Sequence, residues 1–374
     1  MTVPTALSRP GTEARVQATD VSLVRCLETM LAMDASDLHL TVGAPPTVRV
    51  TGSLRPIPGA PKMDSSTLQR IMYAILTQQQ REVFEQRLEL DFSYALPGRA
   101  RFRVNMYQQR ESVGAAFRVI PFEIKNLESL GIPPIVSSFA ALPRGFVLVT
   151  GPTGSGKSTT LAALIDIANT TRHDHIMTVE DPIEFLHRHR SCLVNQREVG
   201  NDTHSFAEAL KHVLRQDPDI ILVGEMRDLE TIQVALTAAE TGHLVFATLH
   251  TQDAAQTVDR IIDVFPPHQQ QQIRQQLAGT LQGVVCQTLC KTADGRGRVA
   301  AVEVLVATAA IRNLIREGKT HQIYSALQAG SQYGMQTLDQ HLAELVRGHR
   351  ITFDQGAEKC HHIEDFTRMT GRQR

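Results

Sequence analysis

The residues with the clearest chemical meaning lie between Gly151 and Ser158, in a stretch that reads GPTGSGKS and fits the P-loop pattern G-x-x-x-x-G-K-[ST]. Glycines let successive backbone N–H groups converge on anionic oxygens, and the N-terminus of the expected following helix adds partial positive charge. Lys157 can reach β- and γ-phosphates, and the Ser158 hydroxyl can bind Mg²⁺. We therefore predict a nucleotide-binding loop made of Gly151, Pro152, Thr153, Gly154, Ser155, Gly156, Lys157, Ser158 and Thr159.

A second candidate group is the acid that ends the apolar run Asp219–Glu225, DIILVGE. A carboxylate at the C-terminal end of a parallel strand can orient Mg²⁺ and its waters. Glu225 is therefore predicted to hold Mg²⁺ together with Ser158, through a water molecule. The residue before it is Gly224, where many P-loop enzymes carry Asp, so the usual position of the metal-side carboxylate is not filled.

Two further strand ends carry groups that could act on a γ-phosphate. Glu180 directly follows an apolar strand and is predicted to be the general base that polarises the attacking water. The acids beside it, Asp181 and Glu184, have the alternative role of stabilising a turn next to a proline. His250 ends another strand and is predicted to sense the γ-phosphate. For His243, at the start of that strand, a structural and a functional role both remain open.

The elements that must position these groups follow a repeating strand–helix pattern. Apolar strand-like runs are expected at 176–179, 220–223 and 244–249, and helices near 205–215, 229–239 and 254–264. This alternation predicts a mostly parallel sheet covered by helices. After residue 266 helical patterns dominate, broken by a strand pair near 284–289 and 299–304, so a helical C-terminal subdomain is expected.

The chain before the loop has a different pattern, typical of a small α+β domain. Helical spacing at 20–33 and 64–87 accompanies short strands at 36–42, 48–50, 101–106 and 113–119. In the last two strands the apolar residues alternate with polar ones that include Arg101, Arg103 and Arg118. Taken alone, these arginines are best explained as the solvated face of an antiparallel sheet.

These patterns predict five segments: a disordered tail at 1–19, an N-terminal domain at 20–121, a linker at 122–143, an α/β core at 144–306, and a helical subdomain with tail at 307–374. The formal net charge is −1, which gives no overall basic excess for nucleic acid. Five scattered cysteines without a signal peptide indicate reduced thiols in the cytosol. No apolar run reaches the roughly 20 residues of a membrane helix.

Four motifs together are more specific than any one of them: Gly151–Ser158, the EDPIE stretch at 180–184, the DPDIILVGEMR stretch at 217–227, and 242–251. Their combination resembles the secretion ATPases of type II secretion and type IV pili, and within them the pilus retraction motors. The resemblance runs from about Ser22 to beyond Met335. The AIRNLIRE stretch at 310–317 is similar to a C-terminal motif of the retraction motors.

The resemblance implies a PAS-like N-terminal domain joined to a RecA-like P-loop ATPase core, with ATP and Mg²⁺ as ligands and a hexameric ring as the assembly. It implies Glu180 as the catalytic glutamate, Glu225 as the Walker B acid and His250 as part of the histidine motif. It also implies that Arg103 and Arg118 reach the nucleotide as domains close. The expected function is an ATP-driven motor for type IV pilus retraction and twitching motility.

The same resemblance implies an inner-membrane platform protein (PilC-like) as partner, a PilU-like paralogue as a second candidate partner, and a cytoplasmic position at the inner membrane without direct insertion. Extension and secretion ATPases usually carry a paired C-x-x-C zinc subdomain and a longer N-terminal region. This chain has only Cys286 and Cys290 in a C-x-x-x-C spacing, which favours retraction. A PilU-like accessory motor and, in a different class, a nucleic-acid translocase remain the alternatives.

Overall fold

The computed structural model describes residues 22–50, 52–120 and 123–371. The chain divides into two compact units, Met1–Ile120 and Pro121–Arg374. The predicted disordered tail at 1–19 lies outside the described residues. Among the described residues, no helix combines the length and the apolar character needed to cross a membrane.

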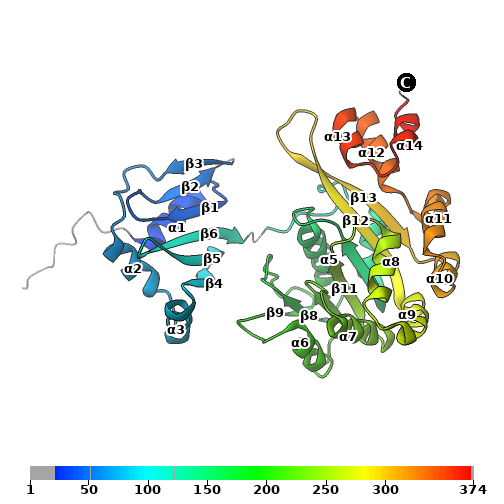
Figure 1. Cartoon of the computed structure of the whole chain (residues 1–374), viewed down its shortest axis with the longest axis horizontal. Helices are drawn as coiled ribbons and strands as arrows, with labels where there is room; N and C mark the ends of the chain where they lie inside the picture. Colours follow the sequence, from blue (N-terminus) through cyan, green and yellow to red (C-terminus); the bar gives the residue numbers. More distant parts are fainter. Residues whose placement is uncertain (1–21, 51, 121–122, 372–374) are drawn as a thin grey trace, which may run out of the picture. The chain divides into compact units, whose positions relative to one another are not determined.

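The described residues of the first unit form a six-stranded antiparallel sheet in the order β3-β2-β1-β6-β5-β4, with three helices (Figure 1). Its strands are β1 (Asp37–Leu40), β2 (Thr47–Val50), β3 (Ser53–Pro56), β4 (Glu89–Leu96), β5 (Ala100–Gln109) and β6 (Ser112–Ile120). Its helices are α1 (Leu23–Ala32), α2 (Ser65–Tyr73) and α3 (Gln78–Arg87). Neither β3 nor β4 was predicted from the sequence. All four residues of β3 are exposed, so it carries no apolar alternation.

Alternation of side chains across β5 separates a core face from an outer face. Phe102, Val104 and Met106 are fully buried, and Arg103 between them is exposed. The helices α1 and α2 cover the apolar face through residues such as Leu27 and Leu68. This agrees with the period-2 pattern expected of a sheet with one solvated face.

The register of β5 against β6 is set by a two-residue turn. Gln109 pairs with Ser112, and the intervening Arg110 and Glu111 have φ of +45° and +61°. Positive φ at both central residues is typical of the type I′ hairpin turn. The turn places Arg103 directly opposite Arg118.

The second unit is built on a seven-stranded sheet in the order β13-β12-β7-β11-β10-β8-β9 (Figure 1). All neighbouring strands are parallel except β12 and β13. The strands are β7 (Gly145–Thr150), β8 (His175–Glu180), β9 (Leu193–Glu198), β10 (Ile220–Val223), β11 (Leu244–Leu249), β12 (Leu281–Lys291) and β13 (Arg298–Val306). Of these, only β9 has no counterpart in the sequence analysis.

Helices follow most of these strands, as the alternating pattern predicted. They are α4 (Pro134–Ser138), α5 (Lys157–Thr171), α6 (Phe206–Val213), α7 (Leu229–Glu240), α8 (Ala254–Asp263), α9 (Pro267–Thr280), α10 (Ala309–Arg316), α11 (Ile323–Ala329), α12 (Leu338–Arg347), α13 (Phe353–Lys359) and α14 (Ile363–Met369). The helix-rich C-terminal end therefore agrees with the sequence pattern.

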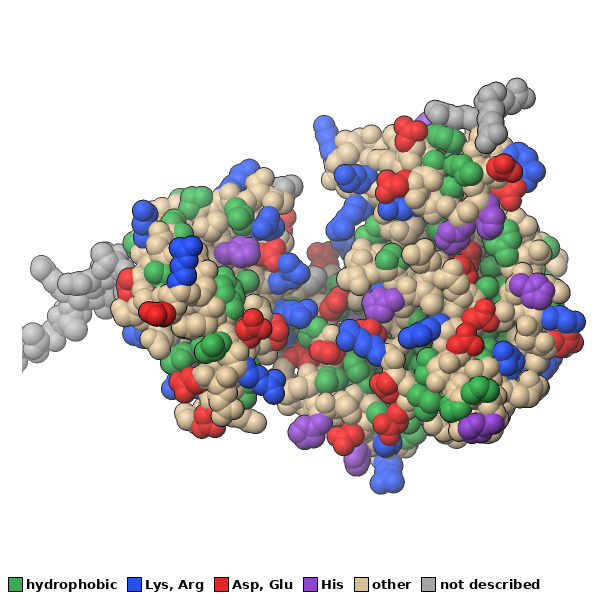
Figure 2. Space-filling view, in the orientation of Figure 1, with side chains coloured by type: hydrophobic (Ala, Val, Ile, Leu, Met, Phe, Trp, Pro, Cys, Tyr) green, Lys and Arg blue, Asp and Glu red, His purple; other side chains and the backbone are tan. Residues whose placement is uncertain are grey.

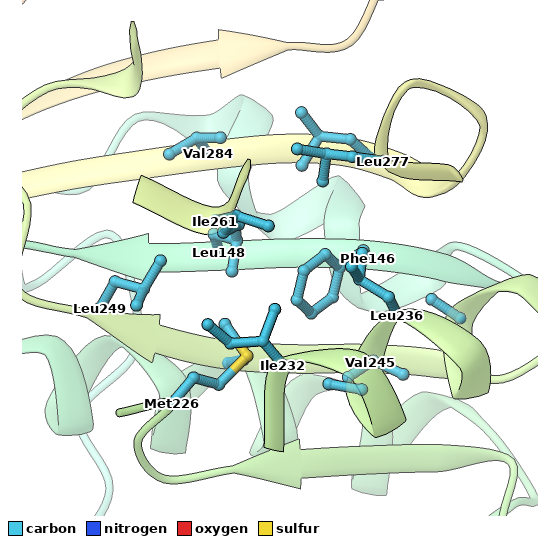
Figure 3. Packing of buried hydrophobic residues seen from close by; sticks show 14 of the residues in the cluster. Phe146, Leu148, Met226, Ile232, Leu236, Val245, Leu249, Ile261, Leu277 and Val284 are labelled. Atoms are coloured by element: carbon cyan, nitrogen blue, oxygen red, sulfur yellow. The ribbon is translucent and has the colours of Figure 1, made fainter. Parts of the chain in front are cut away.

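The central strands are buried on both faces, so they read as continuous apolar runs rather than alternating ones. Every residue of β7 and β11 is buried. Figure 3 shows one face, where Phe146 and Leu148 of β7 pack with Ile232 of α7 and Ile261 of α8. A second cluster on β7, which includes Val147 and Val149, holds residues of α5.

Part of the segment predicted as a linker packs into this second cluster. Leu127, Ile132, Val136 and Phe139 are buried there together with Val147 of β7. Residues 127–139 thus contribute to the hydrophobic core of the second unit. Gly283 of β12 accommodates Phe139, because a Cβ at residue 283 would lie 2.3 Å from the ring.

Candidate nucleotide site

The P-loop joins the end of β7 to the start of α5 through backbone conformations that require glycine. Gly151 has φ +138° and Gly156 has φ +90°, a region that side-chain-bearing residues rarely adopt. A Cβ on Gly151 would lie 2.2 Å from the carbonyl oxygen of Gln287. The loop is therefore pressed against β12 with no room for a side chain at this position.

Gln287 supports the loop from the neighbouring strand. Its Nε2 donates to the carbonyl of Ser155 at 2.6 Å, and its Oε1 accepts from Thr160 Oγ1 at 2.8 Å. The Ser155 Oγ is buried without a partner among the described residues. A buried, unpaired hydroxyl inside a loop of converging N–H groups is consistent with an anionic ligand there.

Lys157 is folded onto its own loop. Its Nζ donates to the carbonyl oxygens of Gly151 at 2.7 Å and Pro152 at 3.1 Å. Burial lowers the pKa of the ammonium group, and the charges of Glu225 and Glu184 oppose this shift. The cation is thus held by weak backbone acceptors, near two carboxylates, in a position from which phosphate oxygens would replace the carbonyls.

Four adjacent parallel strands bring the predicted residues to one edge of the sheet. The strands β7, β11, β10 and β8 are consecutive neighbours, and the P-loop, His250, Glu225 and Glu180 lie at their C-terminal ends. Open α/β sheets bind ligands outside this edge. Beside the P-loop residues Gly156 and Thr159 opens a pocket of about 430 Å³, whose wall includes Phe185.

Glu180 is largely enclosed at the end of β8. Its Oε1 accepts hydrogen bonds from Thr178 Oγ1 at 2.6 Å and from Gln196 Nε2 at 3.1 Å. Burial raises the pKa of the carboxyl group to about 7, although these hydrogen bonds act in the opposite direction. A carboxyl group that titrates near neutral pH is suited to accept a proton in a general-base step.

Glu225 is held by two cationic or potentially cationic partners. Its oxygens accept from Arg227 Nε at 2.6 Å and Nη2 at 2.7 Å, and His250 Nε2 lies 2.8 Å from Oε1. The hydrogen bonds from Arg227 hold the pKa of Glu225 below its usual range, against burial and with help from His250. The structure therefore joins the acid of β10 to the histidine of β11.

Little space is left for a side chain at Gly224, the residue before Glu225. A Cβ on Gly224 would lie 3.1 Å from Glu180 Cα and 3.2 Å from the carbonyl oxygen of Val179. The carbonyl of Gly224 also accepts from Thr248 Oγ1 at 2.5 Å. A side chain at this position would be tight against the backbone at Glu180, so the packing favours glycine at residue 224.

Arg103 and Arg118 belong to the first unit and form part of a row across its outer face. Arg103 is opposite Arg118, and Arg118 is opposite Asp37 of β1. Arg118 Nε donates to Asp37 Oδ1 at 2.8 Å while its side chain stays 71% exposed. Arg103 makes no hydrogen bond or ion pair with any residue that the structure describes, so its charge is available.

Three residues whose roles were open have structural partners. His243 Nδ1 lies 2.9 Å from the carbonyl of Ala238, at the end of α7. Cys286 and Cys290 are buried free thiols, and Cys290 packs among the C-terminal helices with Leu342 and Phe366. Within 22–50, 52–120 and 123–371, no three His, Cys, Asp or Glu side chains are grouped so that they could hold a metal ion.

Comparison with known proteins identifies the family. A family described as type II/IV secretion system protein matches residues 17–355. The chain belongs to this family. It is 54% identical over 332 residues to the Pseudomonas aeruginosa protein named type IV pilus retractation ATPase PilT, covering 89% of this chain and 96% of that protein.

Two further relatives of this secretion-family chain are informative. The Pseudomonas aeruginosa protein named type IV pilus ATPase PilU is 40% identical, over 92% of this chain and 90% of its own length. A crystal structure described as the pilus retraction motor PilT with bound ADP has a TM-score of 0.88 at 45% identity, covering 93% of this chain and 99% of that one. The predicted family and the α/β fold class are confirmed.

Sequence reasoning missed the residues that hold the predicted ones in place. Arg227 lies inside the quoted motif but was assigned no role, and its charge two residues from Glu225 was the available signal. Gln196 and Gln287 carried no such signal, because each contacts its target from a neighbouring strand.

Proposed function

We propose that this chain is an ATP-hydrolysing motor, assembled as a homohexamer, that drives retraction of type IV pili and thereby twitching motility. The observation that carries the proposal is the meeting of the P-loop, Glu180, Glu225 and His250 at one edge of a parallel sheet. Relatives named for pilus retraction support the choice of cellular process.

In this proposal Gly151–Thr159 bind the phosphates of ATP, with Lys157 leaving its backbone acceptors for phosphate oxygens. Glu180 accepts a proton from the attacking water, and its near-neutral pKa supports that role. His250, bonded to Glu225, senses the change when the γ-phosphate leaves. Arg103 and Arg118 supply positive charge to the phosphate being transferred.

The residues at this edge fit Mg²⁺. The Ser158 hydroxyl lies in the first turn of α5 and makes no hydrogen bond to the described residues, so it can serve as a ligand. Glu225 keeps lone pairs beyond those used by Arg227 and His250, which suits contact through water. When bound, Mg²⁺ neutralises charge on the β- and γ-phosphates.

The proposed location is the cytoplasmic side of the inner membrane, reached through a platform protein of the pilus machinery.

On the face shown in Figure 2, basic and acidic side chains are interspersed over the second unit. Together with the net charge of −1, this gives no support to a nucleic-acid translocase.

The chemical part is tested with Glu225→Gln. We expect nucleotide binding to remain while ATP turnover falls by roughly 10²–10³-fold, the usual cost of removing one preorganised group from such a site. Glu230→Gln is the matched control, since Glu230 is exposed and forms an ion pair with Lys211. Undiminished turnover in Glu225→Gln would remove Glu225 from the mechanism.

The cellular part is tested by deleting the gene and counting surface pili. Accumulated pili with lost twitching support retraction, whereas cells without pili would point to extension. The 40% identity to PilU makes an accessory retraction motor the second candidate. Normal twitching in the deletion strain, with loss only when a paralogous motor is also weakened, would favour that role.

A further inference from the structure

The carboxylate of Glu180 is held by two side chains that act on the same oxygen. Thr178 Oγ1 and Gln196 Nε2 both donate to Oε1, at 2.6 and 3.1 Å. Neither of them donates to Oε2, and the backbone N–H of Glu184 also hydrogen-bonds to the carboxylate. The two side-chain donors therefore fix the rotation of the carboxylate and use Oε1, so Oε2 is the oxygen that they leave for accepting a proton.

Sheet geometry brings these three residues together. Thr178 lies two positions before Glu180 on β8, so both side chains project from the same face of the sheet. Gln196 of β9 is the register partner of Thr178 and projects from that face as well. Thr178 is fully buried, so its hydroxyl has no water as an alternative partner.

Gln196 also holds the wall of the pocket beside the P-loop. The same Nε2 donates to the carbonyl of Phe185 at 2.8 Å, and Oε1 accepts from the N–H of His187 at 2.8 Å. Phe185 lines the pocket that contains Gly156 and Thr159. One amide group thus connects a residue in the pocket wall to the carboxylate of Glu180.

We propose that Thr178 and Gln196 are positioning residues for Glu180, and that Gln196 transmits movement of Phe185 to the carboxylate when a ligand fills the pocket. This inference rests on the proposed role of Glu180 as general base. Thr178 keeps the carboxylate in one orientation whether or not a ligand is bound. Gln196 changes its contact with the carboxylate when a ligand binds.

The charged groups around Glu180 come from several elements. Asp181 and Glu184 follow it in the same loop, Glu198 is its register partner on β9, and Arg227 acts on Asp181. Lys157 lies within the influence of Glu184. Burial raises the pKa of Glu180 and the two donors lower it, so losing either donor should raise it further.

The test measures ATP hydrolysis by the full chain between pH 6 and 9 for Thr178→Val and Gln196→Met, which keep approximate size but remove the donors. We expect the rising limb of the kcat–pH profile to move upward by about one pH unit and kcat at pH 7 to fall roughly 5-fold. Thr178→Val should leave KM unchanged, whereas Gln196→Met should also alter KM. Thr178→Ser should restore the wild-type limb.

The matched control is Gln336→Met, because the amide of Gln336 donates to the carbonyl of Val302 away from this edge. Folded Thr178→Val and Gln196→Met proteins with the wild-type pH profile would overturn the inference. If Thr178→Val does not fold, Gln196→Met alone decides. Full activity of Glu180→Gln would instead refute Glu180 as base, and so separates failure of the proposed function from failure of this inference.

Discussion

In the seven-stranded sheet of the second unit, the predicted catalytic groups lie at the ends of parallel strands, on loops that leave the same edge. In the six-stranded sheet of the first unit, Arg103 and Arg118 lie within their strands and Asp37 begins β1, and the three are side by side across three antiparallel strands. In the parallel sheet, residues come together because the strands end at the same edge. In the antiparallel sheet, residues come together because the register places them opposite one another. The first arrangement leaves a signal in each motif, and the second depends on a turn far from the residues themselves.

The largest loss of ATP turnover should come from a change in the P-loop, at the C-terminal edge of the parallel sheet. Lys157→Met removes the ammonium group that the loop holds beside phosphate-binding N–H groups, so we expect ATP turnover to fall by roughly 10²–10³-fold or more. Nucleotide affinity, measured by titration calorimetry, should fall as well. Lys359→Met, which removes an ammonium paired with Glu358, serves as the control. Retained turnover would break the analogy with other P-loop enzymes.

The next effect tests whether Arg103 and Arg118 take part in ATP hydrolysis. Arg103→Ala should lower ATP turnover about 10- to 100-fold, less than the 10³–10⁵ of a lone arginine finger, because Arg118 stands directly opposite and can partly replace it. The double variant should therefore lose more than the product of the single losses. Arg55→Ala, on the exposed strand β3, is the matched control. Equal turnover in all variants would reduce the row to a solvated sheet face.

A third effect concerns stability of the second unit. Glu303 of β13 is 1% exposed and accepts from the N–H of Ala254, the first residue of α8. Burial raises its pKa from the ordinary 4.5 to about 7, so the folded state binds the proton more tightly than the unfolded state. Its contribution to stability is therefore present below about pH 4.5 and is lost as pH rises toward 7.

Glu303→Gln keeps an acceptor for Ala254 and cannot ionise. We expect it to match the wild type at pH 4 or below and to be more stable at pH 8, by on the order of 1–3 kcal/mol. Thermal unfolding at both pH values measures this difference, with exposed Glu317→Gln as the control. A variant that is less stable at pH 8 would show that the ionised carboxylate is needed where it lies.

The smallest effect belongs to the ion pair within the arginine row. Burial acts to raise the pKa of Asp37, but hydrogen bonds from Ser36 and Arg118 outweigh it and hold the pKa below the ordinary 3.8. The stabilisation is thus present above about pH 4 and lost as pH falls below it. Because Arg118 is mostly exposed, Arg118→Ala should cost no more than about 1 kcal/mol at pH 7.

Urea unfolding of Arg118→Ala at pH 7 and at pH 3 checks this expectation. The difference from wild type should shrink at the lower pH, where Asp37 is becoming protonated. Asp37 has a second cationic neighbour, Arg49, whose Nε lies 3.9 Å from Oδ2 and should compensate in part for the loss of Arg118. A loss of several kcal/mol at pH 7 would contradict this expectation. It would also mean that Arg118 acts mainly to stabilise the fold.

Much of the fold was predictable because its signals are local. The buried runs of β7, β8, β10 and β11 are continuous and apolar, and four of the strand ends carry the P-loop, Glu180, Glu225 and His250. The strands β3 and β9 were not predictable from pattern. They lie at sheet edges, where exposure removes the alternation that marks a half-buried strand. The predicted domain boundaries and the roles of the site residues stay predictions.

By itself, the sequence determined where the phosphate-binding pattern lies, since a loop of eight consecutive residues and its flanking strand carry that pattern without help from elsewhere. Only the tertiary structure decided what holds them. His250 on Glu225, Gln196 on Glu180 and Gln287 on the loop depend on strand order and register. Those contacts join residues up to 132 positions apart, so no local pattern could have shown them.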